Sequence, residues 1–178
     1  MNHHLSYGDR PFAIKEHLAS SLHWDLRFHL FGERLLSFYT HEPPHLDPTR
    51  PLKIFRAGDH QLKYLRSERI ILPGRAGAGP TAVWDHGFFR IQGEKTMLYQ
   101  LNQGHLRILV FGQRLRGGYS LKWVGSREDE WQLIKEWDIY ADRFRRFPNV
   151  LTPEKLRELE NPSGKFRDHA NLELFGNL

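Results

Sequence analysis

Hydrophobic and polar residues alternate along residues 22–31, where the chain reads LHWDLRFHLF. The apolar members are Trp24, Leu26, Phe28 and Leu30, and the polar members are His23, Asp25, Arg27 and His29. Successive side chains of a β-strand point to opposite faces, whereas in a helix the polar set would spread around the axis. The alternation therefore predicts a strand with one face in a core and the other carrying imidazole and charged groups.

Strand-like segments recur at short spacing along the chain, separated by Gly, Pro and Asn. We expect strands near residues 12–16, 22–31, 34–40, 52–57, 80–85, 96–101, 105–112, 118–124 and 130–136. Closely spaced strands are typical of an antiparallel sandwich or barrel rather than of alternating strands and helices. The pair Gly32-Glu33 predicts a tight hairpin between the second and third of these strands, because glycine accepts the positive φ angle of such a turn.

Turn and helix signals lie between and after the strands. Residues 41–51 are too rich in proline for regular structure. The glycine-rich loop at residues 73–80 predicts either an ordinary turn or a cradle that holds phosphate through backbone N–H groups. Residues 152–161 predict a short surface helix, with Thr152 as N-cap and Pro153 at the first helical position.

Composition narrows the class of protein. The 178 residues, 39% of them hydrophobic, suffice for one globular domain with a hydrophobic core. The chain has no apolar run of about 18 residues and does not begin with a secretory signal, so we expect a soluble protein of the cytoplasm. The formal charge of +5 suits a polyanionic partner, although such a charge is also common in proteins that bind no nucleic acid.

The chain has no cysteine but eleven histidines. Disulfides and thiolate metal sites are therefore excluded, and any metal would bind His, Asp or Glu. The candidate set is His17, His23 and Asp25, provided that residues 18–21 turn the chain back on itself. Two imidazoles and one carboxylate suit Mn²⁺, Fe²⁺, Zn²⁺ or Co²⁺ and leave positions open for water or substrate. The alternative is that these are ordinary surface residues.

Arg27 continues the same polar face, two residues after Asp25. Its guanidinium would hold a phosphate beside a metal, or else form a salt bridge with Asp25 or Glu33. His60, with Tyr64 four residues later, is a candidate phosphate donor or general acid, or else a structural histidine.

Several blocks of the sequence occur in the order found in a known family. They read KEHLASSLHWDLRFHL, DHQLKY, GAGPTAVWDHG, GHLRILVFGQRLRGGYSLKW and WQLIKEWDIYA. From about Phe12 to Ala141 the chain resembles the 3′-phosphoesterase domain of bacterial and archaeal DNA ligase D and its stand-alone relatives. The resemblance implies a mainly β (α+β) fold, a compact antiparallel β-barrel with short flanking helices. We expect the barrel domain over residues 12–141, an N-terminal arm at residues 1–11 and a C-terminal helical extension at residues 142–178.

The resemblance also implies an activity. Members of this family are Mn²⁺-dependent enzymes, for which Co²⁺ or Zn²⁺ are alternative ions. They process 3′ ends of DNA or primers in repair by non-homologous end joining. They remove a 3′-ribonucleoside and then the 3′-phosphate, and leave a 3′-hydroxyl. By position, the implied metal ligands are His17, His23 and Asp25. The residues implied to contact the scissile phosphate or to line its pocket are Arg27, His60 and Tyr64.

The implied partners follow from that activity. They are nucleic acid 3′ ends and, in the cell, a separate ATP-dependent DNA ligase and an end-binding protein. No membrane partner is expected, and we expect a monomer in the cytoplasm, associated with the nucleoid.

Three positions depart from the family pattern. The family usually carries an acidic residue two positions before the histidine matched by His60, where this chain has Gly58. A lysine of the family appears as Glu42, and an arginine as Leu52. Because of these changes we expect phosphomonoesterase activity over phosphodiesterase activity. The changes leave the candidate metal ligands untouched.

Two other classes of protein remain open. An Fe(II)-dependent oxygenase also places a His-x-Asp pair and a distant histidine on a β-barrel, although we identify no site for a keto-acid carboxylate. A non-catalytic barrel that binds DNA ends or a repair ligase would use the same basic surface without turnover. Mn²⁺-dependent turnover on DNA ends separates the three.

Overall fold

The protein is built mainly from short antiparallel strands. In the computed structural model, which describes residues 8–125, 127 and 129–161, the strands are β1 (Arg10–Leu18), β2 (Leu22–Phe31), β3 (Arg34–Thr40), β4 (Leu52–Gln61), β5 (Arg69–Ile71), β6 (Gly79–Ile91), β7 (His105–Gly112), β8 (Arg116–Trp123) and β9 (Glu130–Lys135). The helical segments are a 3-10 turn, η1 (Leu62–Tyr64), and the α-helices α1 (Met97–Asn102) and α2 (Pro153–Glu160).

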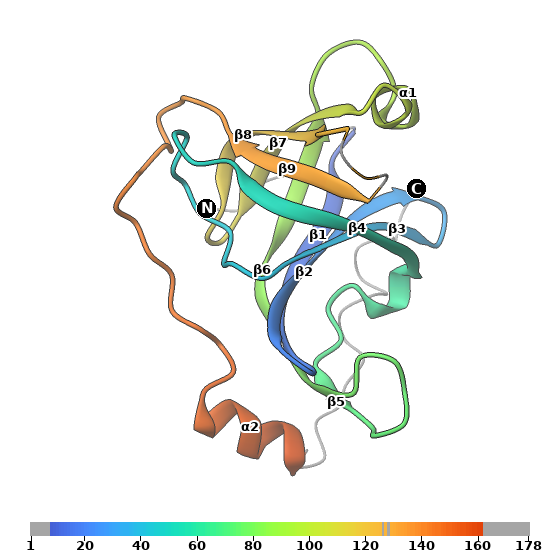
Figure 1. The fold of residues 1–178 in the computed structure, drawn as a ribbon, viewed down its shortest axis with the longest axis vertical. Helices are drawn as coiled ribbons and strands as arrows, with labels where there is room; N and C mark the ends of the chain where they lie inside the picture. Colours follow the sequence, from blue (N-terminus) through green and yellow to red (C-terminus); the bar gives the residue numbers. More distant parts are fainter. Residues whose placement is uncertain (1–7, 126, 128, 162–178) are drawn as a thin grey trace.

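Eight of the strands close into a barrel (Figure 1). The hydrogen-bonded order is β1-β2-β3-β4-β9-β8-β7-β6, and β1 pairs with β6 to complete the circle. The short strand β5 extends the sheet beyond β6. The predicted antiparallel barrel with short helices is therefore confirmed.

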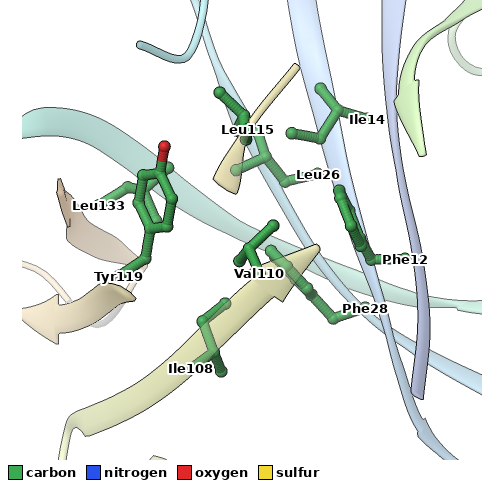
Figure 2. A pocket seen from close by; sticks show the side chains of 9 residues that line it. All are labelled: Phe12, Ile14, Leu26, Phe28, Ile108, Val110, Leu115, Tyr119 and Leu133. Atoms are coloured by element: carbon green, nitrogen blue, oxygen red, sulfur yellow. The ribbon is translucent and has the colours of Figure 1, made fainter. Parts of the chain in front are cut away.

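The interior of the barrel is a packed apolar core. Figure 2 shows side chains that converge there from β1, β2, β7, β8 and β9 and from the turn between β7 and β8: Phe12, Ile14, Leu26, Phe28, Ile108, Val110, Leu115, Tyr119 and Leu133. The space left among them is about 10 Å³, which is the volume that a single water molecule needs. Because the interior is filled, a site for a substrate must lie on the outside of the barrel.

The alternation along β2 separates a core face from an outer face, as predicted. The apolar set is at most 5% exposed and belongs to the core: Trp24, Leu26, Phe28 and Leu30. Strand β1 follows the same rule, since Phe12 and Ile14 point into the barrel (Figure 2). Lys15 and His17 alternate with them and lie on the outer face, opposite Asp25 and His23 of β2.

Residues 96–101, predicted as a strand, form the helix α1 instead. The Thr96 side chain caps this helix by accepting a hydrogen bond from the backbone N–H of Tyr99 at 3.2 Å. Met97 and Leu101 lie four residues apart and pack toward the core. A spacing of four places two side chains on one face of a helix and of a strand alike, so the apolar spacing does not distinguish the two. The strand prediction is wrong because it overlooked Thr96, whose side chain caps a helix. Strand β5 and the turn η1 were not predicted, because each contains only three residues.

The hairpin between β2 and β3 and the C-terminal helix α2 are confirmed. Gly32 has a φ of 51°, and β2 pairs directly with β3. In α2, the Thr152 side chain accepts a hydrogen bond from the backbone N–H of Lys155 at 3.2 Å, and Pro153 lies in the first turn.

An extended segment, residues 136–152, joins β9 to α2 along the outside of the barrel (orange in Figure 1). The backbone N–H of Val150 donates a hydrogen bond to the buried carboxylate of Glu16 in β1 at 2.7 Å. The ring of Phe147 packs edge-on against Trp84 of β6, with centroids 5.5 Å apart. These contacts tie the segment to the two strands that close the barrel.

The predicted division of the chain stays a prediction. Residues 1–7 of the N-terminal arm and 162–178 of the C-terminal extension lie outside the described residues. Within the described ranges, neither α-helix has the length and apolar character required to cross a membrane.

Candidate metal and phosphate site

A tight turn between β1 and β2 brings three potential metal ligands together. The chain reverses over residues 19–21, so that His17 at the end of β1 lies opposite His23 at the start of β2. Asp25 follows two residues later on the same face. One ligand atom from each of these three residues lies within 4.8 Å of the others. The turn that the sequence analysis required is present, and the structure groups the three side chains as expected.

Each imidazole makes one contact with the carboxylate and one with a backbone carbonyl. His17 Nδ1 lies 3.3 Å from Asp25 Oδ2, and His23 Nε2 lies 3.6 Å from Asp25 Oδ1. The opposite ring nitrogens lie 2.8 Å from the carbonyl oxygen of Gly77 and 3.0 Å from that of Ser21, respectively. A carbonyl oxygen only accepts hydrogen bonds, so these outer nitrogens carry the protons.

This proton arrangement is the strongest test of whether the cluster fits a metal. In a neutral imidazole, the nitrogen that carries no proton presents a lone pair, here directed toward the Asp25 carboxylate. Two lone pairs and an anionic oxygen converge, and they repel one another unless a proton or a cation lies between them. Metal-binding histidines commonly donate their other N–H to a backbone carbonyl, as both do here. The donor set of two nitrogens and one oxygen fits a borderline divalent cation.

The electrostatic environment keeps Asp25 ionised. Burial disfavours the charged carboxylate, but when a proton lies between His17 and Asp25, the hydrogen bond that it forms and the charges of Arg27 and protonated His23 outweigh burial and hold the pKa of Asp25 below its usual value. A ligand oxygen with full negative charge is thus available at neutral pH.

Arg27 lies beside the cluster with donors to spare. Its terminal nitrogens lie 3.5 Å from Asp25 Oδ2 and 3.2 Å from the backbone carbonyl of Tyr64. Its Nε is buried and has no hydrogen-bond partner among the described residues. An unpaired buried donor is costly, and a phosphate oxygen would satisfy it. The sequence left open whether Arg27 holds a phosphate or forms a salt bridge. The salt bridge to Asp25 is present, but it occupies only part of the guanidinium.

His60 contacts a serine that neighbours Arg27 in the sheet. Ser37 of β3 lies opposite Arg27 of β2, and its Oγ is 3.0 Å from His60 Nδ1. Because Ser37 Oγ donates its own proton to the carbonyl of Leu35 at 3.3 Å, it accepts the proton on Nδ1 and leaves Nε2 as the unprotonated nitrogen. Burial, followed by the charge of Arg27, lowers the pKa of His60.

Tyr64 contacts Arg27 through its backbone rather than its ring. The carbonyl accepts the hydrogen bond described above, and two cations lie close to the ring, with Lys63 Nζ 5.1 Å and Arg69 Cζ 4.8 Å from its centroid. The role of the Tyr64 side chain as a wall of the substrate pocket stays a prediction.

A buried lysine, absent from the predicted site, completes the cationic side of the cluster. Lys15 is 2% exposed and lies opposite Asp25 in the register of β1 and β2. Burial and the nearby Arg27 lower its pKa to about 7. The signal that would have identified Lys15 is its position two residues before His17, which places both side chains on one face of a strand.

A cleft opens beside the candidate ligands. It has a volume of about 530 Å³ and is lined by Ala19, Ser20, Ser21, His23, Asp25, Tyr39, His41, Gly77 and Ala78. Arg27, His60 and Tyr64 are not among the lining residues. Tyr39 and His41 were not predicted, because they come next to Asp25 and His23 only through the pairing of β2 with β3.

The glycine-rich loop forms one side of this cleft. Gly77 has a φ of 72°, and a Cβ atom there would lie 3.1 Å from Cε1 of His17. Glycine at this position lets the backbone approach the imidazole and accept its hydrogen bond. The loop therefore positions His17 as well as forming a turn, and its contact with phosphate stays a prediction.

The three departures from the family pattern differ in their structural setting. Leu52 points into the core and is 2% exposed, whereas the next residue, Lys53, lies on the outer face. Glu42 forms an exposed ion pair with Arg50 at 2.6 Å. Gly58 is exposed, and nothing lies within 4 Å of the Cβ that another residue would add.

The fold and the site define a class of protein: a closed antiparallel β-barrel that carries a possible metal-binding His-His-Asp cluster and a buried arginine on its outer wall. Comparison with known proteins identifies the family within that class. A protein family described as "DNA Ligase D 3'-phosphoesterase domain" matches residues 15–122, and the chain belongs to this family. The match includes each of the six predicted site residues.

Two relatives carry the same name, "Multifunctional non-homologous end joining protein LigD". The protein from Pseudomonas aeruginosa is 33% identical over 144 residues, which cover 80% of this chain and 17% of the relative. The protein from Mycolicibacterium smegmatis is 28% identical over 149 residues, which cover 80% of this chain and 19% of the relative. The chain thus corresponds to less than a fifth of the length of either relative.

Proposed function

We propose that the protein is a metal-dependent phosphoesterase that processes the 3′ ends of DNA or RNA-terminated primers in DNA repair. It would remove 3′-phosphates and 3′-ribonucleosides and leave a 3′-hydroxyl for a polymerase or ligase. The observation that carries this proposal is the convergence of two imidazole lone pairs and the Asp25 carboxylate, beside a buried arginine with an unpaired donor. Membership of the phosphoesterase family supports it over an Fe(II) oxygenase.

The residues divide the work by position. His17, His23 and Asp25 would hold Mn²⁺, or Co²⁺ or Zn²⁺, and the bound ion would neutralise a phosphate oxygen and make the phosphorus more electrophilic. The unpaired Nε of Arg27 would donate to a second oxygen as negative charge develops there. Arg27 would thus orient the phosphate beside the ion.

His60 would supply or hold a proton. Ser37 fixes the proton on Nδ1, so Nε2 is the nitrogen that exchanges a proton with the substrate. A phosphate dianion nearby favours the imidazolium form, from which Nε2 donates to the phosphate or protonates the leaving oxygen.

The direct test uses labelled primer-templates that end in a 3′-phosphate or a 3′-ribonucleotide. Incubation with Mn²⁺ is expected to yield 3′-hydroxyl ends, and a chelator is expected to abolish the reaction. His23→Ala should behave like the chelated wild type, whereas His105→Ala, which removes an exposed imidazole from β7, should retain activity. Binding of the ends without Mn²⁺-dependent turnover would instead identify a non-catalytic end-binding module.

A nucleic acid substrate is a polyanion, so its binding should depend on the salt concentration. The chain carries a formal charge of +5, and each phosphate contact releases counterions, so binding should weaken steeply as salt rises. A Michaelis constant that stayed the same between low and moderate salt would contradict a nucleic acid substrate.

We further propose that removal of the phosphate is retained more fully than removal of a nucleoside. Support comes from Gly58 and Glu42, which replace residues of the family pattern near His60 and before the proline-rich loop. Release of 3′-phosphate should exceed release of ribonucleoside when both ends are presented at equal concentration.

In the cell we propose a monomer that acts in the cytoplasm, alongside an ATP-dependent DNA ligase and an end-binding protein, with residues 12–141 as its catalytic unit.

A further inference from the structure

Two aromatic rings continue the outward row of residues that contains Asp25. In the strand register, Asp25 of β2 lies opposite Tyr39 of β3, and Tyr39 lies opposite Phe55 of β4. The rings of Tyr39 and Phe55 are stacked, with centroids 5.2 Å apart and planes inclined by 25°. Since β2, β3 and β4 are neighbours in the barrel (Figure 1), the rings extend from the candidate ligands across its outer wall.

A histidine and a lysine border the two rings. His41 is exposed and lies edge-on to Tyr39 and Phe55, at centroid distances of 5.7 and 6.5 Å. Lys53 Nζ lies 5.4 Å from the centroid of Phe55 and 2.8 Å from a carboxylate oxygen of Glu130. The Lys53 side chain is 56% exposed, so its charge remains accessible from solvent. Stacked rings with a cation at the far end are thus present beside the candidate metal ligands.

These rings are not part of the barrel core. Their inward neighbours Phe38 and Ile54 are at most 1% exposed and fill the interior, whereas Tyr39 and Phe55 are only partly buried. Tyr39 and His41 line the cleft of about 530 Å³ that is also lined by two of the candidate ligands, His23 and Asp25. Sites for small molecules have volumes of about 300–1,000 Å³, so the cleft has room for one nucleotide.

We infer that Tyr39 and Phe55 form a stacking surface for the base of the 3′-terminal nucleotide, whose phosphate lies at the candidate metal ligands. This inference rests on the proposed function and adds a base-binding subsite to it. Aromatic stacking accepts every base, because each base has a π-face, and Lys53 attracts the phosphates of the same strand. The protein then detects that a terminal base is present without reading which base it is.

The test is an equilibrium binding measurement with a chelator present, so that no end is hydrolysed. Fluorescence anisotropy compares two primer-templates with a 3′-phosphate, one with a base on the terminal nucleotide and one abasic there. Loss of the base is expected to weaken binding by wild-type protein roughly 5- to 150-fold. In the double variant Tyr39→Leu, Phe55→Leu, the same loss is expected to change binding by less than about twofold, because the stacking partners are gone.

Two variants serve as matched controls. Phe111 is 37% exposed and has the Arg90 guanidinium 5.2 Å from its ring centroid, but its strand β7 lies four positions from β3 in either direction around the barrel. Phe111→Leu should therefore retain the dependence on the terminal base. Tyr39→Phe should retain it as well, because the ring is kept. Thermal unfolding of each variant confirms that it is folded.

The outcomes separate this inference from the proposed function. A dependence on the base that the double variant loses and the controls keep supports the stacking surface, whether or not the end is hydrolysed. Equal binding of the two DNAs by wild-type protein, or no binding of either, overturns it, as does a dependence unchanged in the double variant. Hydrolysis with Mn²⁺ is measured in parallel: turnover without base dependence retains the function and rejects the subsite, and base dependence without turnover does the reverse.

Discussion

Replacement of Arg27 tests the proposed chemistry most directly. The Arg27 side chain is 9% exposed, its guanidinium contacts Asp25 and the Tyr64 carbonyl, and its third donor, Nε, has no partner in the described part of the chain. If that donor stabilises charge in the transition state, Arg27→Met should lower kcat by about 10²–10³-fold, equivalent to about 2.7–4 kcal/mol. Arg27→Lys keeps the charge but loses the fork of donors, so a loss of roughly 10- to 150-fold is expected, the worth of one hydrogen bond to a charged group.

The assay is single-turnover release of phosphate from a 3′-phosphate primer with saturating protein and Mn²⁺. Under these conditions the rate reports the chemical step rather than substrate binding. Thermal unfolding with and without Mn²⁺ verifies that each variant is folded and binds the ion. A folded Arg27→Met protein that released phosphate within about twofold of the wild-type rate would refute the reasoning, because the loss of a donor that stabilises the transition state must slow the chemical step.

Three further measurements address the site and the fold. Mn²⁺ at about 100 times its dissociation constant adds about 2.7 kcal/mol to the free energy of unfolding and should raise the unfolding midpoint by roughly 5–11 °C, a shift that His23→Ala should abolish; an undiminished shift would contradict the ligand assignment. Asp138→Asn should lower the free energy of unfolding by about 2 kcal/mol, because the carboxylate lies 2.6 Å from the buried Lys135 ammonium. Burial opposes the charge on Asp138, but the hydrogen bond from Lys135 helps to hold the pKa of Asp138 below its usual value. The difference in the free energy of unfolding between variant and wild type should therefore be constant above about pH 4 and shrink in stronger acid. Denaturant titrations measure this difference, and one that persisted at about pH 2 would argue against the reasoning. Gly79→Ala should cost about 1–3 kcal/mol in the same titrations, because a Cβ there would lie 2.0 Å from the Leu18 carbonyl oxygen at a φ of 138°, and wild-type stability would show that the backbone moves aside freely.

The local pattern of the sequence was sufficient for the faces of β2 and for the hairpin that follows it. A period of two reports strand geometry directly, and Gly32 supplies a backbone angle that few other residues accept. The same pattern failed at residues 96–101, because a short apolar run does not distinguish a strand from a helix without a capping signal. Thr96 was that signal, in the same role that Thr152 plays before α2.

The composition of the candidate site depended more on tertiary structure. The sequence allowed His17 to meet His23 only if a turn formed, and the structure supplies it. Tyr39 comes next to Asp25 through the register of β2 and β3, which an irregularity between His29 and Phe31 shifts from the register that the hairpin turn alone would set. The closing pair β1 and β6 joins segments that are far apart in the chain, so the order of strands around the barrel had no signal in any one segment.

The filled interior affects the kind of molecule that the protein can bind. A ligand that docks on the outer wall is held from one side, so a long polymer can run past it into solvent without being threaded through an opening. An end already gripped by other proteins would still be reachable. Because inward residues pack the core and exposed residues do not, an exposed position such as Gly58 can vary while the core beneath it is unchanged.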